Sequence, residues 1–92
     1  MAMDGSASSR SVLLIDGDPD TREILGVLLG EAGWEVVETG DMGEGVELAL
    51  RHRPAAVISE YTLSLPADPG WSVPDALARA GVRPRVHIVF TA

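Results

Sequence analysis

Two short apolar runs that each end in an acidic residue constrain the fold of this chain most. Residues 12–15 are followed by Asp16, and the run that begins at Ala55 ends at Glu60. Continuous apolar runs of this length are typical of strands buried on both faces, as in a parallel sheet. If both runs are parallel strands, their carboxylates lie at one edge of the sheet, where ligands of open α/β sheets bind.

Helical and strand patterns alternate along the rest of the chain. We expect strands at 12–15, 34–38, 55–59 and 85–91 and helices at about 18–33, 41–51 and 74–80. With right-handed crossovers, the order βαβαβαβ predicts an α/β fold in which helices flank a parallel sheet. Residues 1–10 are small and polar and are interpreted as a flexible N-terminal tail, so the predicted domain spans 11–92. Pro66, Pro69 and Gly70 predict a loop after the third strand.

The first two helices have recognisable ends and apolar stripes. Asp18 precedes Pro19 and is expected to cap the first helix, which Gly33 ends. Asp41 and Glu44 have the spacing of a capping box at the start of the second helix. The stripes expected to face the sheet are Ile24, Leu25, Leu28 and Leu29 in the first helix and Met42, Val46, Ala49 and Leu50 in the second.

Composition excludes several classes of protein. The net charge is −7 and lysine is absent, which argues against a nucleic-acid partner because phosphate contacts require a basic surface. No cysteine is present, so disulfides and thiolate metal sites are excluded, as is usual in the cytoplasm. No apolar stretch approaches the roughly 20 residues that span a bilayer. We therefore expect a cytoplasmic protein with no membrane partner.

Three segments of the chain resemble the receiver domain of two-component response regulators. They are residues 13–25 (LLIDGDPDTREIL), 53–60 (RPAAVISE) and 86–92 (VHIVFTA). The resemblance runs from about Ser11 to Ala92 and implies a flavodoxin-like sheet of strand order 2-1-3-4-5. The family continues through a fourth helix, a fifth strand and a fifth helix that have no counterpart here. In that order, the strand at 85–91 would be an exposed sheet edge.

The resemblance also implies a site for phosphoryl transfer. In the family, a histidine kinase phosphorylates an aspartate after the third strand, two acids after the first strand position magnesium, and a hydroxyl and a lysine contact the phosphoryl group. The first acid corresponds to Asp16, the second acid to Gly17, the phosphoacceptor to Glu60 and the hydroxyl to Thr91. The lysine has no corresponding position.

These departures predict a signalling interaction module that is not phosphorylated in the usual way and is not an enzyme. Glutamate is one methylene longer than aspartate, and a misplacement of about 1 Å can cost about 100-fold in rate. Glu60 either imitates a phosphorylated aspartate by reaching toward Thr91 or is a solvated acid at a strand end. A receiver that is phosphorylated at an unconventional residue is the alternative within the same fold.

Asp18 has two further interpretations besides the helix cap. It can replace the ligand missing at Gly17, which would give a weak magnesium site with Asp16 and Glu60. Residues 13–18 (LLIDGD) also resemble the first motif of haloacid-dehalogenase-type phosphatases, with Asp16 as nucleophile and Asp18 as general acid/base. Against that enzyme, Asp20 stands where the family has threonine, and no lysine is present.

The remaining conspicuous residues are assigned to structure and to partners. His52 is expected at a solvated helix end and His87 on a strand face, and neither has a neighbour at metal-ligand spacing. Trp34 and Trp71 are expected to pack at a strand start and over the loop after Glu60. The predicted partner is a protein chain, or a second copy in a dimer, that pairs with the edge strand at 85–91.

Overall fold

Strands and helices alternate through the part of the chain that the structure, a computed structural model, describes: residues 10–60 and 73–90. The elements are β1 (Ser11–Ile15), α1 (Pro19–Glu31), β2 (Glu35–Thr39), α2 (Met42–His52), β3 (Ala56–Glu60), α3 (Val73–Arg79) and β4 (Val86–Phe90). The predicted order βαβαβαβ is confirmed. Most boundaries shift by one or two residues; for example, β2, β3 and β4 each begin one residue later than predicted, and β1 and α3 begin one residue earlier.

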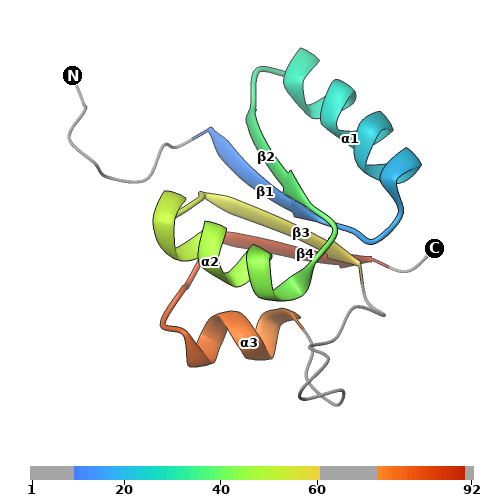
Figure 1. The fold of residues 1–92 in the computed structure, drawn as a ribbon. Helices are drawn as coiled ribbons and strands as arrows, with labels where there is room; N and C mark the ends of the chain where they lie inside the picture. The colour runs from blue at the N-terminus through green and yellow to red at the C-terminus, as the bar shows by residue number, and fades with distance from the viewer. Residues whose placement is uncertain (1–9, 61–72, 91–92) are drawn as a thin grey trace.

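The four strands form one parallel sheet of order β2-β1-β3-β4. Leu13 in β1 pairs with Val37 on one side and with Val57 on the other, so β1 is an inner strand. Helix α1 lies on one face of the sheet, and α2 and α3 lie on the other (Figure 1). The predicted fold class, a flavodoxin- or receiver-like parallel sheet flanked by helices, is confirmed.

The main hydrophobic core lies between the sheet and helices α2 and α3. It joins Leu13, Ile15 and Val57 of the strands to buried residues of the two helices, including Met42, Ala49 and Leu77. Of the predicted α2 stripe, Met42 and Ala49 are buried, but Leu50 is exposed and that part of the prediction is wrong. The helix instead buries Gly45, where an added Cβ would lie 2.7 Å from Ile15 Cδ1. A close approach of α2 to β1 at this glycine determines which side chains face the core.

Helix α1 covers its face of the sheet less completely than its apolar stripe predicts. Leu25 and Leu29 are half-buried, but Ile24 and Leu28 are 60% and 57% exposed, and no residue of α1 is fully buried. These side chains are exposed because of where α1 lies over the sheet. Helix α1 packs on β2 and β1, and within the described residues no helix lies beside it over β3 and β4 (Figure 1).

Two backbone hydrogen bonds and the side chain of Arg10 close the carboxyl end of α1. The N–H of Gly33, at φ 96°, donates to the carbonyl of Gly30, and the N–H of Trp34 donates to that of Leu29, each at 3.0 Å. This is a Schellman motif, which confirms the predicted role of Gly33. Arg10 adds to it, since its guanidinium donates to the carbonyls of Gly33 (3.1 Å) and Ala32 (3.0 Å).

The Arg10 guanidinium carbon also lies 5.9 Å from the centre of the Trp34 ring, within range of a cation–π contact. Trp34 is therefore packed at the start of β2, as expected. The loop with Pro66, Pro69, Gly70 and Trp71, like Thr91, lies outside the described residues. None of the described helices is long and apolar enough to cross a membrane.

Candidate functional site

Two neighbouring strands bring acidic residues to the carboxyl edge of the sheet. Ile15 pairs in parallel register with Ser59, so Asp16 directly follows β1 while Glu60 is the last residue of β3. The chain leaves β1 toward β2 on one side and later returns to β3 on the other. The gap between β1 and β3 is thus the point where the winding reverses, which is the usual ligand site of open α/β sheets.

Asp16 is buried and held in place by its neighbours. Only 3% of the residue is exposed. Its Oδ1 accepts a hydrogen bond from the N–H of Asp18 at 2.8 Å, and its own N–H donates to the carbonyl of Thr39 at 3.0 Å. The Asp16 carboxylate therefore shapes the turn between β1 and α1.

Asp18 caps helix α1, as predicted. Its backbone is extended, and its carboxylate accepts hydrogen bonds from the N–H of Asp20 at 3.2 Å and from Oγ1 of Thr21 at 2.7 Å. The Thr21 hydroxyl, followed by the Asp20 N–H, lowers the pKa of the Asp18 carboxyl below its ordinary value. Both carboxylate oxygens of Asp18 are thereby engaged at the helix end.

The donor atoms at this edge do not fit the magnesium site considered for Asp16, Asp18 and Glu60. Across residues 10–60 and 73–90, no three histidine, aspartate or glutamate side chains are close enough together to hold a metal ion. Hard divalent cations require clustered oxygens, and the Asp18 oxygens are turned to the helix end.

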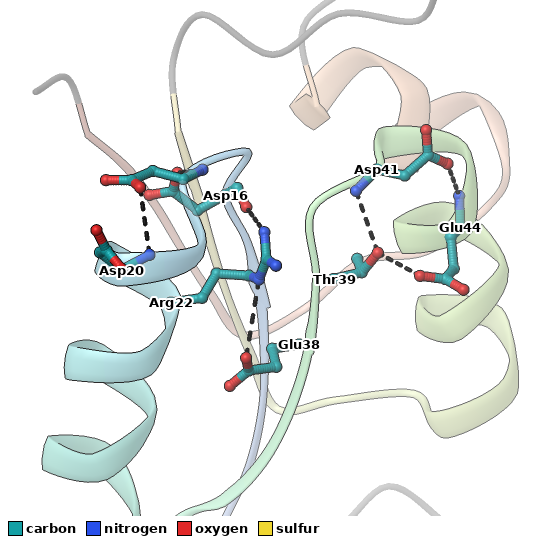
Figure 2. Close-up of polar contacts among 8 residues, drawn as sticks. Asp16, Asp20, Arg22, Glu38, Thr39, Asp41 and Glu44 are labelled. Carbon is teal, nitrogen blue, oxygen red and sulfur yellow. Dashed lines mark hydrogen bonds and ion pairs between the residues drawn. The ribbon is translucent and has the colours of Figure 1, made fainter.

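Arg22 is a cation at this edge that the sequence patterns did not single out. Its Nη1 donates to the backbone carbonyl of Asp16, and its Nε lies 3.8 Å from Oε1 of Glu38 in β2 (Figure 2). A Cβ at Gly40 would lie 2.4 Å from Arg22 Nη1, so this glycine leaves room for the guanidinium. Arg22 connects α1 to the ends of β1 and β2. Its position one helical turn after Asp18 was the available signal.

The second cap differs from the predicted capping box. Asp41 accepts from the N–H of Glu44 at 2.7 Å, as predicted. The Glu44 carboxylate, however, accepts from the Thr39 hydroxyl, and Thr39 Oγ1 in turn accepts from the N–H of Asp41 at 3.1 Å (Figure 2). Thr39 therefore links Asp41 to Glu44, the two residues of the predicted capping box, and it is almost fully buried. Its position at the end of β2 was the signal that sequence reasoning did not use.

The predicted site residues are brought together only in part. Asp16 and Asp18 are in direct contact through the turn, and Glu60 lies half-buried at the end of the neighbouring strand, paired in register with Phe90. Gly17 is exposed between the two aspartates. Thr91, the residue matched to the family's hydroxyl, lies outside the described residues, so its relation to Glu60 stays a prediction.

A serine–histidine contact lies close to Glu60 on the α2/α3 face. Ser59 is fully buried, and its Oγ lies 2.9 Å from Nε2 of His87 in β4. His87 is half-buried, and burial lowers its pKa below the ordinary histidine value. His87 is thus a strand-face residue, as expected, and His52 lies exposed in the last turn of α2.

Among solved structures, the chain is similar to the N-terminal domain of an uncharacterized protein from Wolinella succinogenes. The two chains are 30% identical with a TM-score of 0.72, and the match covers 89% of this chain and 64% of the other. This chain therefore spans less than two thirds of that structure. No family model matches the sequence, and no curated protein matches it. The similarity supports the fold, and the description of that protein states no function.

Proposed function

We propose that this chain is a receiver-like signalling module that acts through protein contacts and not through its own phosphorylation. The observation that carries the proposal is the placement of Asp16 and Glu60 on adjacent parallel strands at the point where the winding reverses. That is the position of the phosphorylation site in the receiver family that the sequence resembles. A solved domain of similar fold supports the architecture.

Three features of the site argue against ordinary phosphoryl transfer. Glu60 replaces the family's aspartate with a longer side chain, Gly17 supplies no metal ligand, and Asp18 is engaged at the helix end. A phosphatase that uses Asp18 as general acid fits no better, because the hydrogen bonds from Thr21 and Asp20 lower the pKa of its carboxyl and so disfavour the protonated form that a general acid requires. The proposal is therefore for a non-enzymatic module.

The test is treatment with acetyl phosphate and magnesium, followed by mass spectrometry of the intact chain. We expect no phosphoryl adduct on the wild type or on Glu60→Gln. The matched variant Glu60→Asp restores the family's residue and shows whether side-chain length alone prevents transfer. An adduct on wild type that is absent from Glu60→Gln would contradict the proposal and favour phosphorylation at an unconventional residue.

A permanent signalling state is part of the same proposal. The resemblance assigns Glu60 to the position of the phosphorylated aspartate, and the residue lies at the end of β3 beside β4. Removing its charge with Glu60→Gln should change amide chemical shifts along the ends of β3 and β4. Spectra that differ only at residue 60 itself would favour a solvated acid without a signalling role.

The edge of β4 is the proposed contact surface. Val86, Ile88 and Val89 are 50%, 50% and 41% exposed on a strand at the sheet edge. Such an edge can pair with a strand of another chain or of a second copy. Sedimentation velocity should reveal a dimer that Val89→Lys weakens, because charged residues protect natural sheet edges. A monomer at all concentrations would leave only a different protein as the pairing partner.

A further inference from the structure

Four arginines that are spread along the chain gather at the edge of the sheet where the strands begin. Arg51 and Arg53 lie where α2 ends before β3, and Arg83 and Arg85 lie between α3 and β4. The backbone places these two segments side by side, because the N–H of Arg85 donates to the carbonyl of Ala55 at 3.0 Å. Neighbouring strands are about 4.8 Å apart, so the four residues share one small surface. We call them the arginine patch.

The arginine patch is formed entirely by described residues. The connections from α2 to β3 and from α3 to β4 each have both flanking elements in the structure. Both connections lie at the edge of the sheet where β3 and β4 begin (Figure 1). The chain leaves β4 at the opposite edge, beyond Phe90. The patch therefore lies away from the end of β4.

None of the four guanidinium groups is engaged within residues 10–60 and 73–90. All four residues are exposed, and none forms an ion pair or a side-chain hydrogen bond in that part of the chain. Like charges held close together repel one another, so the clustering itself adds no stability. A cation in the last turn of α2 is favourable for the helix dipole, which accounts for Arg51 but not for Arg83 or Arg85.

The backbone of Arg53 is a second, independent observation. At φ 48° and ψ 59°, it is the one described residue other than glycine with a positive φ. The ends of α1 and α3 use glycine for the same conformation, at Gly33 (φ 96°) and Gly81 (φ 82°). A residue with a Cβ is disfavoured there, and such outliers cluster at functional sites. An arginine retained where glycine is more stable indicates a role for its side chain.

The chemistry of the arginine patch favours carboxylates as ligands. The planar guanidinium group donates two parallel hydrogen bonds to a carboxylate or a phosphate. A long nucleic acid fits less well, because exposed acids occupy the other half of the same edge: Glu31 at the end of α1 and Glu35 at the start of β2. Residues 51–55 and 80–85 also contain no Phe, Tyr or Trp on which bases could stack.

We infer that the arginine patch binds a short acidic segment of a partner protein, rich in glutamate or aspartate. The inference supplies the chemistry of a partner for the interaction module proposed above, and it rests on that proposal only in requiring a protein partner. It uses neither Glu60 nor strand pairing by β4. A phosphoryl adduct or a monomeric chain in the tests above would therefore leave the result below unchanged.

The probe is a fluorescein-labelled peptide of about ten residues in which glutamates alternate with serines. The control peptide has glutamine in place of every glutamate. Fluorescence anisotropy with the whole 92-residue chain measures both affinities. We expect the glutamine peptide to bind at least about tenfold more weakly, because the charge-assisted hydrogen bonds are lost. Raising NaCl from about 20 to 200 mM should weaken the glutamate peptide at least about fivefold, because exposed charges are screened.

Two further probes carry other anions. One is a labelled single-stranded DNA of about six nucleotides, which has a charge similar to that of the peptide. The other is a vesicle of phosphatidylserine and phosphatidylcholine, measured by cosedimentation. We expect the DNA to bind more weakly than the glutamate peptide and the vesicles to carry down no protein.

Matched variants of the protein locate the binding surface. We expect Arg83→Gln and Arg85→Gln each to weaken the glutamate peptide at least about threefold. Val27→Glu is the control, since it changes the net charge by the same amount at an exposed position on α1 and should change the affinity less than about twofold. Arg53→Gly should weaken binding while raising the melting temperature, because glycine adopts this conformation without strain.

Three results would overturn the inference. The first is equal affinity for the glutamate and glutamine peptides, or variants of the patch that bind no more weakly than Val27→Glu. The second is tighter binding of the DNA or the vesicles, which would assign the patch to phosphate groups. The third is a concentration-dependent dimer that Arg85→Gln dissociates, which would assign the patch to the acids of a second copy of this chain.

Discussion

The two faces of the sheet carry similar apolar side chains but differ in how much of them is covered. On the α2/α3 face, Leu77 and Met42 are 1% and 2% exposed. On the α1 face, Leu28 and Ile88 are 57% and 50% exposed. Burial of apolar area is the main favourable term in folding. The α2/α3 face therefore supplies most of the stability, whereas apolar side chains on the α1 face stay accessible within residues 10–60 and 73–90.

The same substitution in a helix on each face should give the largest difference. Leu77→Ala removes a fully buried side chain and should lower the free energy of unfolding by about 2–5 kcal/mol. Leu28→Ala, on the exposed part of α1, should change it by less than about 0.5 kcal/mol. Urea unfolding followed by circular dichroism measures both. Similar losses for the two variants would mean that the α1 face is covered in solution.

Loss of a threonine hydroxyl should likewise cost more stability at the cap of α2 than at the cap of α1. Thr39→Val removes a buried hydroxyl that bonds Glu44 and Asp41, and it should cost about 1–3 kcal/mol. Thr21→Val removes an exposed bond and should cost less at neutral pH. Urea unfolding at neutral pH compares the two, and a larger loss for Thr21→Val would reverse the comparison.

The Thr21 variant has a second readout, in the titration of Asp18. Because the Thr21 hydroxyl is the main cause of the lowered Asp18 pKa, Thr21→Val should raise that pKa toward the ordinary value in an NMR titration. The stabilisation by ionised Asp18 is present above the unfolded value of about 3.8 and is lost as pH falls through the folded pKa.

Two helical glycines extend the comparison to backbone packing. Gly45→Ala in α2 would place a methyl group 2.7 Å from Ile15 Cδ1 and should lower the free energy of unfolding by about 1 kcal/mol. Gly30→Ala in α1 meets nothing within 4 Å and should raise it by about 0.5–1 kcal/mol. Thermal unfolding should therefore shift in opposite directions. An increase in stability for both would mean that α2 can move away from β1 at little cost.

The smallest expected effect concerns His87, on the α2/α3 side of β4. Burial lowers its pKa below 6.5, so the unfolded chain binds more protons between the two values, and stability falls as pH falls through this range. Melting temperatures between about pH 5 and 8 should show this loss in the wild type and not in His87→Gln. The exposed histidine supplies the control, since His52→Gln should keep the pH dependence.

Local features of the fold could be predicted because their causes lie within a few residues. The apolar runs of β1 and β3, the Asp18 cap and the Gly33 terminus each depend on short-range sterics or hydrogen bonds, and each was expected from sequence. The strand order followed from the resemblance to receivers. Boundaries differed by one or two residues, as is usual at element ends.

Features that depend on distant residues could not be predicted. The apolar stripe of α1 is correct as a pattern, but a pattern does not say which neighbouring element covers it, and Ile24 and Leu28 are exposed. Leu50 is exposed because α2 turns the face with Met42, Gly45 and Ala49 toward the sheet, and the stripe alone does not fix that rotation. Arg22 bonds the backbone carbonyl of Asp16, and its spacing from Asp18 does not identify that acceptor. At the candidate site, the acids and the Asp18 cap could be placed from sequence, but the second bond to the Asp18 carboxylate, from the Thr21 hydroxyl, could not.

Polar contacts attach α1 to the rest of the fold at both of its ends. At one end, Arg22 ties the helix to Asp16 and Glu38, and at the other Arg10 holds the carbonyls of Ala32 and Gly33. Between these attachments, α1 rests on the half-buried Leu25 and Leu29 and buries nothing fully. The helix is thus fixed at both ends by polar contacts, and no fully buried side chain holds its middle.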